Sequence, residues 1–426
     1  MRQNEPAILS YGNRKYMISG AKITLIVTGS IAAYKSAELV RELSRSGATV
    51  QPILTRAAME FITPLTLQAL AGQPVTTDLF DLRSEADIGH IALADTADVV
   101  LVAPATADFI AKAAVGIADD VALAVLLATK APVVIAPAMN VNMWENERTQ
   151  ANVERLRAQG VSFVEPGVGE LACGWQGAGR FAETAHIVEH LQDVLTPNDL
   201  AGSRVIVTAG PTREPIDPVR FVSNRSTGRM GYALARVCSW SGGEVHLVSG
   251  PTELAAPAGV KVHHVQTAEE MRNKVFELAL APATEQLRSQ FVFMAAAVTD
   301  HRPAQVAETK LKHDKTKSYD LHLEPCPDIL EELGRRRTEI AEASKLRIKL
   351  IGFSAEVGDE DAILGWARQK LERKNVDLMV GNPADEAFGK ETNRVWLLER
   401  GGRQEEVATA DKQYIAGRIL RAALRV

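Results

Sequence analysis

Short apolar runs rich in β-branched residues alternate with helical patterns along nearly the whole chain. In the first half, the runs are ITLIVTG (23–29), ATVQPILT (48–55), ADVVLVAP (97–104), APVVIAPAM (131–139) and VSFVEP (161–166). A helix with a small-residue and Leu face follows the first run, and an Ala-rich helix is expected over 107–129. This alternation is typical of βαβ units around a parallel sheet whose two faces are covered by helices.

The pattern restarts after a polar break, TPNDLAGS (196–203). RVIVTAG (204–210) begins a second series, which continues with EVHLVSG, QFVFMAAAV, LRIKLIGFSAEV, VDLMVGN and RVWLLER. A length of 426 residues fits about two to three domains. We therefore expect two Rossmann-like three-layer α/β domains with mainly parallel sheets, over 21–195 and 204–426, joined by the linker 196–203 and preceded by a polar extension, 1–20.

Composition excludes several classes of protein. The net charge of -5 argues against a nucleic-acid binder, which would carry a basic excess. The three cysteines lie far apart, which rules out a disulfide framework and fits a reducing compartment. No apolar run approaches the ~18 residues of a membrane helix, and the N-terminus lacks the apolar core of a signal peptide. A cytoplasmic location without a membrane partner is expected.

In the first domain, candidate ligand-binding residues follow the predicted strands. The turn GSIAAYK (29–35) brings small residues to the start of a helix, where backbone N–H groups can approach a phosphate, although a tight turn without a ligand would look similar. Polar residues in PATADFIAK (104–112) and PAMNVNMW (137–144) fall where α/β sheets bind ligands, or simply cap helices. A lone histidine such as His90 is more often structural than catalytic. Cys173 lies in a Gly-rich loop, which makes it less typical of core filling.

In the second domain, the loop AGPTREPIDPVRFVSNRSTGRMG (209–231) ends at a helix start and offers hydroxyl, amide and guanidinium donors to an anion. KLKHDKTK (310–317) is either a solvated basic face or a lid over a polyphosphate. Lys370 and Lys374, one helical turn apart, can point toward one anion or simply carry surface charge. No GxxxxGK[ST] is present, so a P-loop nucleotidase is excluded.

Taken together, these segments resemble two enzyme families in series, over roughly residues 21–420. GSIAAYK, the His90 segment, PATADFIAK, PAMNVNMW and the ACGWQGAGR stretch are similar to flavin-dependent cysteine decarboxylases. The 209–231 loop, AAAVTDHRP, the Lys-rich segment and GFSAE are similar to phosphopantothenate–cysteine ligases. Their order on one chain resembles the bacterial bifunctional family that carries phosphopantothenoylcysteine decarboxylase and phosphopantothenate–cysteine ligase for coenzyme A synthesis.

The resemblance implies two linked reactions on small molecules. The second domain would use CTP and Mg²⁺ to activate 4′-phosphopantothenate as an acyl-cytidylate, which cysteine then attacks. The first domain would use FMN to oxidise the cysteinyl thiol toward a thioaldehyde, which eases the loss of CO2 and leads to 4′-phosphopantetheine. The family also implies a homo-oligomer, based on trimers of the decarboxylase domain and dimers of the ligase domain.

The resemblance also implies roles for residues at matching positions. In the decarboxylase, His90 matches the active-site base, Asn140 the group that holds the substrate carboxylate, and Cys173 the proton donor. FMN contacts are expected from Gly29, Ser30, Ile31, Thr55 and Thr106. In the ligase, Asn224 matches the residue needed for the acyl-cytidylate to react onward, and Lys310 the lysine needed to form it. The CTP site is expected to comprise Lys310 with Met294, Ala295, Ala296, Asp300, Pro327, Asp328, Ile329, Leu330, Phe353, Lys370 and Lys374. No metal ligands are assigned.

Two departures from the family pattern concern the CTP site. Cys326 stands where Asn is common, and His313 interrupts the Lys-rich run. Two alternatives remain for the first domain: a non-catalytic flavin-binding scaffold, and a decarboxylase of peptides ending in cysteine. The presence of His90, Asn140 and Cys173 argues against the first, and the linked ligase against the second.

Overall fold

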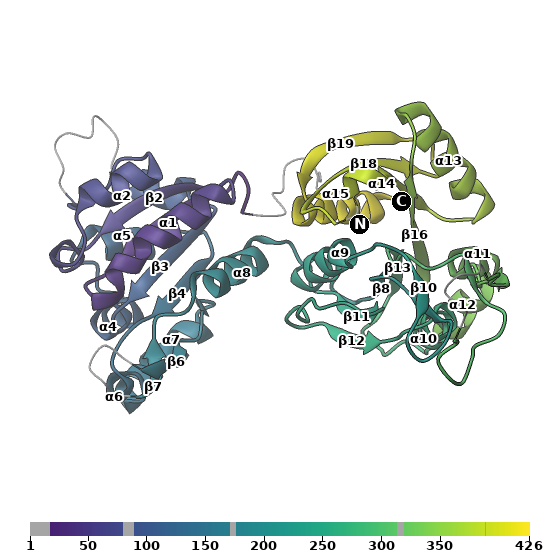
Figure 1. Cartoon of the computed structure of the whole chain (residues 1–426). Helices are drawn as coiled ribbons and strands as arrows, with labels where there is room; N and C mark the ends of the chain where they lie inside the picture. Colours follow the sequence, from purple (N-terminus) through teal and green to yellow (C-terminus); the bar gives the residue numbers. More distant parts are fainter. Residues whose placement is uncertain (1–17, 80–88, 171–175, 313–318, 388) are drawn as a thin grey trace. The chain divides into compact units, whose positions relative to one another are not determined.

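A computed structural model describes residues 18–79, 89–170, 176–312, 319–387 and 389–426 (Figure 1). The chain forms two compact units, Met1–Thr196 and Pro197–Val426. The predicted extension 1–20 lies mostly outside the described residues, but Ile18 is fully buried and its N–H donates to Gln192 Oε1 at 3.1 Å. The N-terminal unit therefore begins before the first strand.

The N-terminal unit is built on a five-stranded sheet with the order β2-β1-β3-β4-β5. All four neighbouring pairs are parallel. The strands are β1 (Lys22–Val27), β2 (Thr49–Leu54), β3 (Val99–Ala105), β4 (Val133–Pro137) and β5 (Ser162–Phe163). The order reverses between β1 and β3, and ligands of open α/β sheets bind beyond the carboxyl ends of the strands at such a point.

Helices cover both faces of this sheet. One face packs against α1 (Ser36–Arg45), α2 (Pro64–Ala71) and α8 (Thr184–Leu195). The other packs against α3 (Gly89–Thr96), α4 (Ala107–Val115), α5 (Val121–Ala128), α6 (Val141–Trp144) and α7 (Glu147–Ala158). Two short 3-10 turns, η1 (Ile31–Lys35) and η2 (Ala58–Glu60), follow β1 and β2. The hairpin of β6 (Gly167–Glu170) and β7 (Gln176–Arg180) follows β5.

The prediction of a single helix over 107–129 is wrong. The structure has two helices there, because Gly116 ends α4 in the left-handed conformation at φ 76° and Asp120 caps the start of α5. Glycine adopts that conformation without the strain a Cβ would add, so it commonly ends helices. The second helix then begins where the Asp120 carboxylate accepts from Leu123 N at 2.8 Å.

The C-terminal unit contains an eight-stranded sheet with the order β12-β11-β8-β13-β16-β17-β18-β19. The first six strands of that order are parallel, and the last two add antiparallel pairs. The strands are β8 (Ser203–Ala209), β11 (Glu244–Ser249), β12 (Lys261–His264), β13 (Ser289–Met294), β16 (Arg347–Glu356), β17 (Leu378–Pro383), β18 (Thr392–Glu399) and β19 (Gln404–Asp411). The order reverses between β8 and β13, as in a Rossmann fold.

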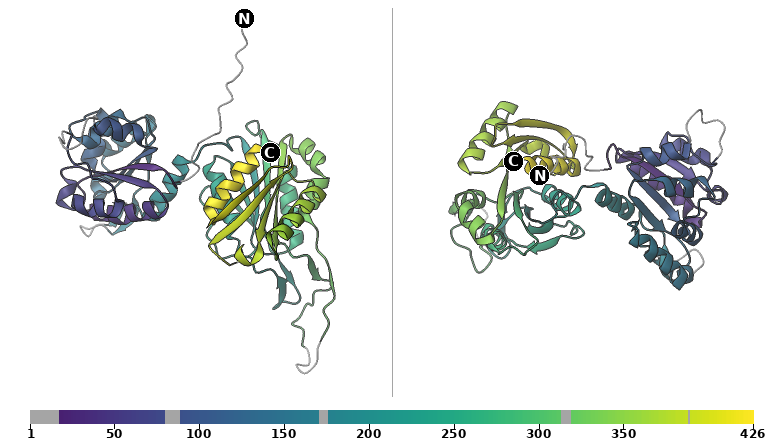
Figure 2. Two further views of the ribbon diagram at one scale, coloured as in Figure 1. Left: turned by 90° about the horizontal axis from the view of Figure 1, so that it is seen from above. Right: turned by 180° about the vertical axis from the view of Figure 1, so that it is seen from behind.

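Helices also sandwich this second sheet (Figure 2). One face packs against α9 (Arg229–Trp240) and α15 (Lys412–Arg425). The other packs against α10 (Ala268–Leu280), α11 (Ile329–Arg335), α12 (Arg337–Ser344) and α13 (Glu360–Arg373). The short helix α14 (Ala384–Ala387) follows β17. The expected mainly parallel α/β architecture is confirmed in both units.

Two small hairpins decorate the C-terminal unit: β9 (Arg213–Pro215) with β10 (Phe221–Ser223), and β14 (His301–Pro303) with β15 (Leu323–Pro325). The predicted linker 196–203 is in part integral to this unit, because Leu200 is fully buried in its core. Among the described residues, no helix is long and apolar enough to cross a bilayer.

Candidate active sites

The residues expected to contact FMN gather at the carboxyl edge of the N-terminal sheet. Thr55 follows β2, Gly29, Ser30 and Ile31 follow β1, and Thr106 follows β3. Hydrogen bonds join these segments: Thr28 Oγ1 donates to the carbonyl of Pro104 at 2.8 Å and accepts from Thr106 N at 3.0 Å. Thr106 caps α4, and the Ser30 hydroxyl accepts from Ala32 N. The strand order thus brings these separate turns to one edge of the sheet.

Asn140 lies at the same edge, after β4. Its side chain accepts from Asn142 N at 2.9 Å and caps α6. The neighbouring Met139 N donates to Gly179 O at 3.0 Å, which ties the β6–β7 hairpin to this segment. At Gly179, with φ 135°, a Cβ would lie 2.4 Å from the carbonyl oxygen of Met139. The glycine is therefore required for this close approach.

The structure describes less of the surroundings of His90 and Cys173. His90 is the second residue of α3 and is partly exposed. Cys173 lies outside the described residues, in the connection between β6 and β7. The structure therefore brings Asn140 and the FMN candidates to one edge of the sheet and places His90 in the first turn of α3.

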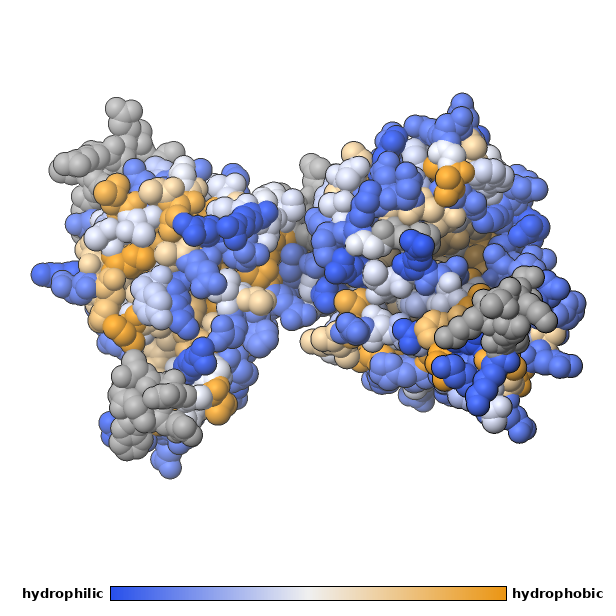
Figure 3. All heavy atoms as spheres, viewed as in Figure 1, coloured by the Kyte–Doolittle hydropathy of each residue, from blue (hydrophilic) through white to orange (hydrophobic). Residues whose placement is uncertain are grey.

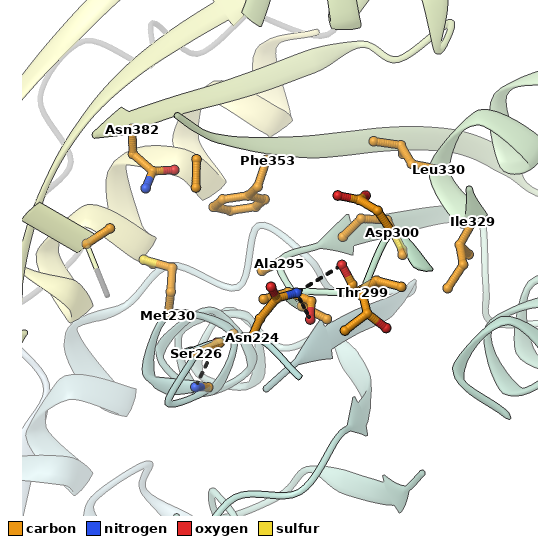
Figure 4. Close-up of a pocket in the computed structure, with 18 of the residues that line it drawn as sticks. Asn224, Ser226, Met230, Ala295, Thr299, Asp300, Ile329, Leu330, Phe353 and Asn382 are labelled. Atoms are coloured by element: carbon orange, nitrogen blue, oxygen red, sulfur yellow. Dashed lines mark hydrogen bonds between the residues drawn. The ribbon is translucent and has the colours of Figure 1, made fainter. Parts of the chain in front are cut away.

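The C-terminal unit has a cavity of about 560 Å³ at the carboxyl end of its sheet (Figure 4). It is lined by most residues expected to bind CTP, namely Met294, Ala295, Ala296, Asp300, Pro327, Asp328, Ile329, Leu330, Phe353, Lys370 and Lys374. Asn224 and the start of α9 also line it. These residues come from five elements or turns that are distant in sequence, and the parallel sheet collects them at one edge.

Asn224 sits at the middle of this site. Its Nδ2 donates to the carbonyls of Ala297 and Val298, each at 3.1 Å, and Figure 4 shows both bonds. The segment after β13 is in turn held to the end of β8, because Ala297 N donates to Gly210 O at 2.9 Å. The Asn224 amide thus bridges the 209–231 loop and the β13 turn, across the point where the strand order reverses.

Two ion pairs lie among the cavity residues that are expected to bind the nucleotide. Asp328 caps α11 and pairs with Lys374, whose Nζ lies 2.8 Å from its Oδ2. Burial opposes ionisation of Asp328, but the Lys374 ammonium and the N–H of Glu331 outweigh it and hold the pKa of the carboxyl below its usual value. Lys370 pairs with Glu356 at 2.5 Å. Two lysines, in the last turn of α13 and directly after it, therefore lie beside the cavity, and each is paired with a carboxylate.

Lys310 does not line the cavity in this structure. It is exposed, in the connection between β14 and β15. The next residue is anchored, however: Leu311 N donates to Asp217 Oδ2 at 3.1 Å, and its carbonyl accepts from Arg220 Nη2 at 3.1 Å. His313 lies outside the described residues, whereas Cys326 lines the cavity, and its sulfur lies 3.9 Å from Thr299 Oγ1.

The cavity also includes polar residues that sequence reasoning missed, namely Asn382, Asn393 and Lys412. All three are nine-tenths or more buried. A signal existed for Asn382, because it ends the buried run VDLMVGN, where a parallel sheet presents ligands. Asn393 and Lys412 come from the antiparallel extension of the sheet and carried no such signal.

Comparisons with known proteins identify a family for each unit and relatives for the whole chain. Residues 12–196 match the flavoprotein family, and residues 200–426 match the DNA/pantothenate metabolism flavoprotein C-terminal domain. The coenzyme A biosynthesis bifunctional protein CoaBC of Vibrio cholerae is 42% identical over 407 residues, which cover 95% of this chain and 98% of that protein. The CoaBC protein of Bacillus subtilis is 41% identical over 412 residues, covering 95% and 97%.

Solved structures are similar to parts of the chain. The C-terminal domain of a CoaBC protein is 35% identical with a TM-score of 0.42, covering 54% of this chain and 97% of that one. The FMN-dependent cysteine decarboxylase SpaF is 32% identical with a TM-score of 0.36, covering 41% and 98%.

The two family matches, in this order on one chain, define a flavoprotein joined to a pantothenate-metabolism domain. The chain belongs to the family of coenzyme A biosynthesis bifunctional proteins. It is accordingly a bifunctional enzyme with phosphopantothenoylcysteine decarboxylase and phosphopantothenate–cysteine ligase activities. The resemblance inferred from the sequence is confirmed, as is flavin as the cofactor class of the N-terminal unit.

Proposed function

We propose that the C-terminal unit joins 4′-phosphopantothenate to cysteine with CTP, in the cavity at the carboxyl end of its sheet. The observation that supports this proposal is the convergence on one cavity of every expected CTP residue except Lys310. A nucleotide triphosphate is highly anionic, and Lys370 and Lys374 place two ammonium groups at that cavity, which would exchange or share their carboxylate partners with the phosphates.

The ligation proceeds in two steps. A carboxylate oxygen of 4′-phosphopantothenate attacks the α-phosphorus of CTP, and the bond to the bridging oxygen breaks to release pyrophosphate. The amine of cysteine then attacks the acyl carbon, CMP leaves with the electron pair of the broken C–O bond, and the amine loses a proton. Asn224, fixed by two backbone carbonyls, is suited to orient the acyl-cytidylate for the second step. Lys310 supports the first step once its segment closes over the triphosphate.

For the N-terminal unit we propose FMN as the flavin and 4′-phosphopantothenoylcysteine as the substrate. The edge between β1 and β3 suits FMN, because Ser30 and Thr106 present hydroxyls and α4 starts there. FMN would accept electrons from the cysteinyl thiol and return them after CO2 is lost. Asn140 would hold the substrate carboxylate, His90 would accept a proton, and Cys173 would deliver one to complete the reduction.

Mg²⁺ is proposed to enter with CTP. Mg²⁺ typically binds through one or two carboxylates together with substrate phosphates. Over the described ranges, no cluster of three or more His, Cys, Asp or Glu side chains is arranged to hold a metal. Asp300 is a carboxylate at the cavity that is available to such a nucleotide-bound ion. Chelation by EDTA should therefore stop ligation and leave decarboxylation of supplied 4′-phosphopantothenoylcysteine unchanged.

We also propose that the protein is a homo-oligomer in a reducing cytoplasm. Large apolar side chains are exposed on the N-terminal unit, including Leu65, Leu127, Ile31 and Tyr34, each at least 60% exposed. Figure 3 shows hydrophobic residues gathered on the face of that unit which it presents. Surfaces of this kind mark interfaces between chains. The thiols of Cys238 and Cys326 are unpaired, which fits a reducing compartment.

Mass spectrometry of the products tests the whole proposal. Purified, FMN-loaded protein is mixed with 4′-phosphopantothenate, cysteine, CTP and Mg²⁺. Appearance of 4′-phosphopantetheine with CMP supports both reactions and their coupling. Accumulation of 4′-phosphopantothenoylcysteine alone would contradict the role of the N-terminal residues, and absence of any product would contradict the assignment of both sites.

A further inference from the structure

Thr28 lies where β1 and β3, the strands at which the order of the N-terminal sheet reverses, leave their ladder. The two strands are paired in parallel from Ile23 with Val99 to Ile26 with Val102. Thr28 directly follows β1, beyond the last of these pairs, and it is only 2% exposed. A buried polar side chain at this point is able to hold the two chain segments together after the ladder has ended.

Three hydrogen bonds join Thr28 to the segment that ends β3. Its N–H and its hydroxyl both donate to the carbonyl of Pro104, at 3.2 and 2.8 Å. The hydroxyl also accepts from the N–H of Thr106 at 3.0 Å. A hydroxyl has a single proton, and Thr28 gives it to Pro104, so this side chain cannot also donate to a phosphate. Thr28 therefore acts on its neighbours and not on a ligand.

The two segments that Thr28 joins are both expected to contact FMN. Gly29 and Ser30 follow Thr28 directly, and Ser30 N donates to the carbonyl of Thr28 at 2.9 Å. On the other side, Thr106 caps the nine-residue helix α4, because its hydroxyl accepts from Phe109 N at 3.3 Å. The hydrogen bonds of Thr28 thus set how far the start of α4 lies from the turn after β1.

This separation matters for a ligand that contacts both segments. Such a ligand binds more tightly when the segments are already held in place, because ordering them on binding would cost free energy. We propose that Thr28 is a positioning residue for FMN, whose hydroxyl holds the turn after β1 and the start of α4 at the separation that the flavin requires. This inference rests on the proposed binding of FMN at this edge of the sheet and adds a residue that does not touch the cofactor.

The Thr28→Val variant tests the inference, because valine has nearly the shape of threonine but lacks the hydroxyl. In this variant, Thr106 N loses its acceptor and Pro104 loses one of its two donors from Thr28. We expect the dissociation constant of FMN to rise at least tenfold, as measured by flavin fluorescence on serial dilution of the full-length holoprotein. Thr28→Ser restores the hydroxyl, so its dissociation constant should stay within threefold of that of the wild type.

Thr24→Val is the matched control. Thr24 lies on β1, is 3% exposed and donates its hydroxyl proton to the carbonyl of Leu93 at 3.3 Å. The control therefore also removes a buried hydroxyl from this strand, but away from the turn that follows the strand. Its FMN dissociation constant should stay within twofold of wild type. Equal weakening of FMN binding in the two valine variants would indicate a general loss of packing and would overturn the inference.

Hydrogen exchange in the flavin-free protein tests the geometry separately from the cofactor. Exchange of the Thr106 amide should accelerate at least tenfold in Thr28→Val, because this amide loses its acceptor. The same amide should exchange at the wild-type rate in Thr24→Val. An unchanged rate in Thr28→Val would contradict the proposed role of the hydroxyl.

Thr28→Cys provides a second variant if Thr28→Val does not fold. A thiol is a weaker donor and a weaker acceptor than a hydroxyl, so FMN should bind more weakly to Thr28→Cys than to Thr28→Ser. Equal affinities of these two folded variants would count against the inference. Failure of the wild-type protein to bind FMN would instead contradict the proposed function of the N-terminal unit, which keeps the two failures distinguishable.

Discussion

At the scale of single residues, the Asp217 carboxylate joins two segments far apart in sequence. Its side chain is fully buried and accepts from Val219 N, Arg220 N, the Arg220 guanidinium and Leu311 N. The Arg220 guanidinium and the backbone donors outweigh burial and hold the pKa of Asp217 well below its usual value. Since Leu311 follows Lys310, this ion pair anchors the segment that carries the expected catalytic lysine.

Asp217→Asn should therefore slow formation of the acyl-cytidylate while CTP still binds. The neutral amide would lose its charge-assisted bonds to Arg220 and leave the Lys310 segment loosely held. We expect at least a tenfold fall in the ligase kcat, with little change in the KM for CTP. Decarboxylation of supplied 4′-phosphopantothenoylcysteine is the internal control, and an unchanged ligase kcat would contradict the anchoring role.

The lowered pKa of Asp217 also leads to a prediction of how the stability of the C-terminal unit depends on pH. Its pKa is lower in the folded state than the value of about 3.9 in an unfolded chain. Its contribution is therefore present above pH of about 4 and is lost as the pH falls toward the folded pKa. Thermal unfolding between pH 3 and 7 should show a smaller acid destabilisation of the C-terminal unit in Asp217→Asn than in wild type.

A glycine contact places the β6–β7 hairpin beside Asn140. In Gly179→Ala, the new Cβ would clash with the carbonyl of Met139 and strain a backbone with φ 135°. We expect the decarboxylase kcat/KM to fall at least tenfold, because the hairpin would shift relative to Asn140, and the ligase to be unaffected. Gly167→Ala, in the same hairpin with only ordinary contacts at 3.7 Å and beyond, should retain full activity.

At the scale of elements, the buried Arg204 on β8 closes the end of α10. Its guanidinium donates to the carbonyls of Leu278, Ala281 and Pro282 and to Gln290 Oε1, at 2.7 to 3.3 Å. The last carbonyls of a helix lack partners within the helix, so a buried donor from the sheet replaces water there. This contact fixes α10 against the central strand of the C-terminal sheet.

Arg204→Met should lower the free energy of unfolding of the C-terminal unit by about 3 kcal/mol, since several buried acceptors lose their donor. Amide hydrogen exchange of residues 268–280 should accelerate strongly. Arg347→Met, which removes an exposed guanidinium from the start of β16, serves as the control and should change stability by less than about 0.5 kcal/mol. Equal exchange in both variants would contradict the role of Arg204.

At the scale of the whole molecule, two units with separate sheets and separate cores carry the two activities. Each expected catalytic group belongs to one unit alone. Cys173→Ser should stall decarboxylation after CO2 is lost and leave ligation intact, whereas Lys310→Met should abolish acyl-cytidylate formation and leave decarboxylation of supplied substrate intact. Product analysis by mass spectrometry separates these results, and loss of both activities in either variant would contradict this division.

The strands that form the parallel cores were predictable from short runs of residues. β1, β2, β3 and β4 extend at most one residue beyond the predicted runs, and so do the parallel strands β8, β11, β16 and β17. A strand buried on both faces must be apolar throughout, and this requirement is visible in the sequence. The short edge strand β12, the outer strand β19 and the two small hairpins were missed, because partly exposed strands carry no such continuous signal.

The sequence by itself determined the two α/β units, the family and the residues that end each strand, because local patterns and motifs are properties of neighbouring residues. Only the tertiary structure decided which of those residues share a cavity. Asn393 and Lys412 reach the ligase cavity through an antiparallel extension, whereas Lys310 lies outside it although its motif is present. Strand order and the packing of β18, β19 and α15 depend on contacts between distant segments, and no local pattern encodes them.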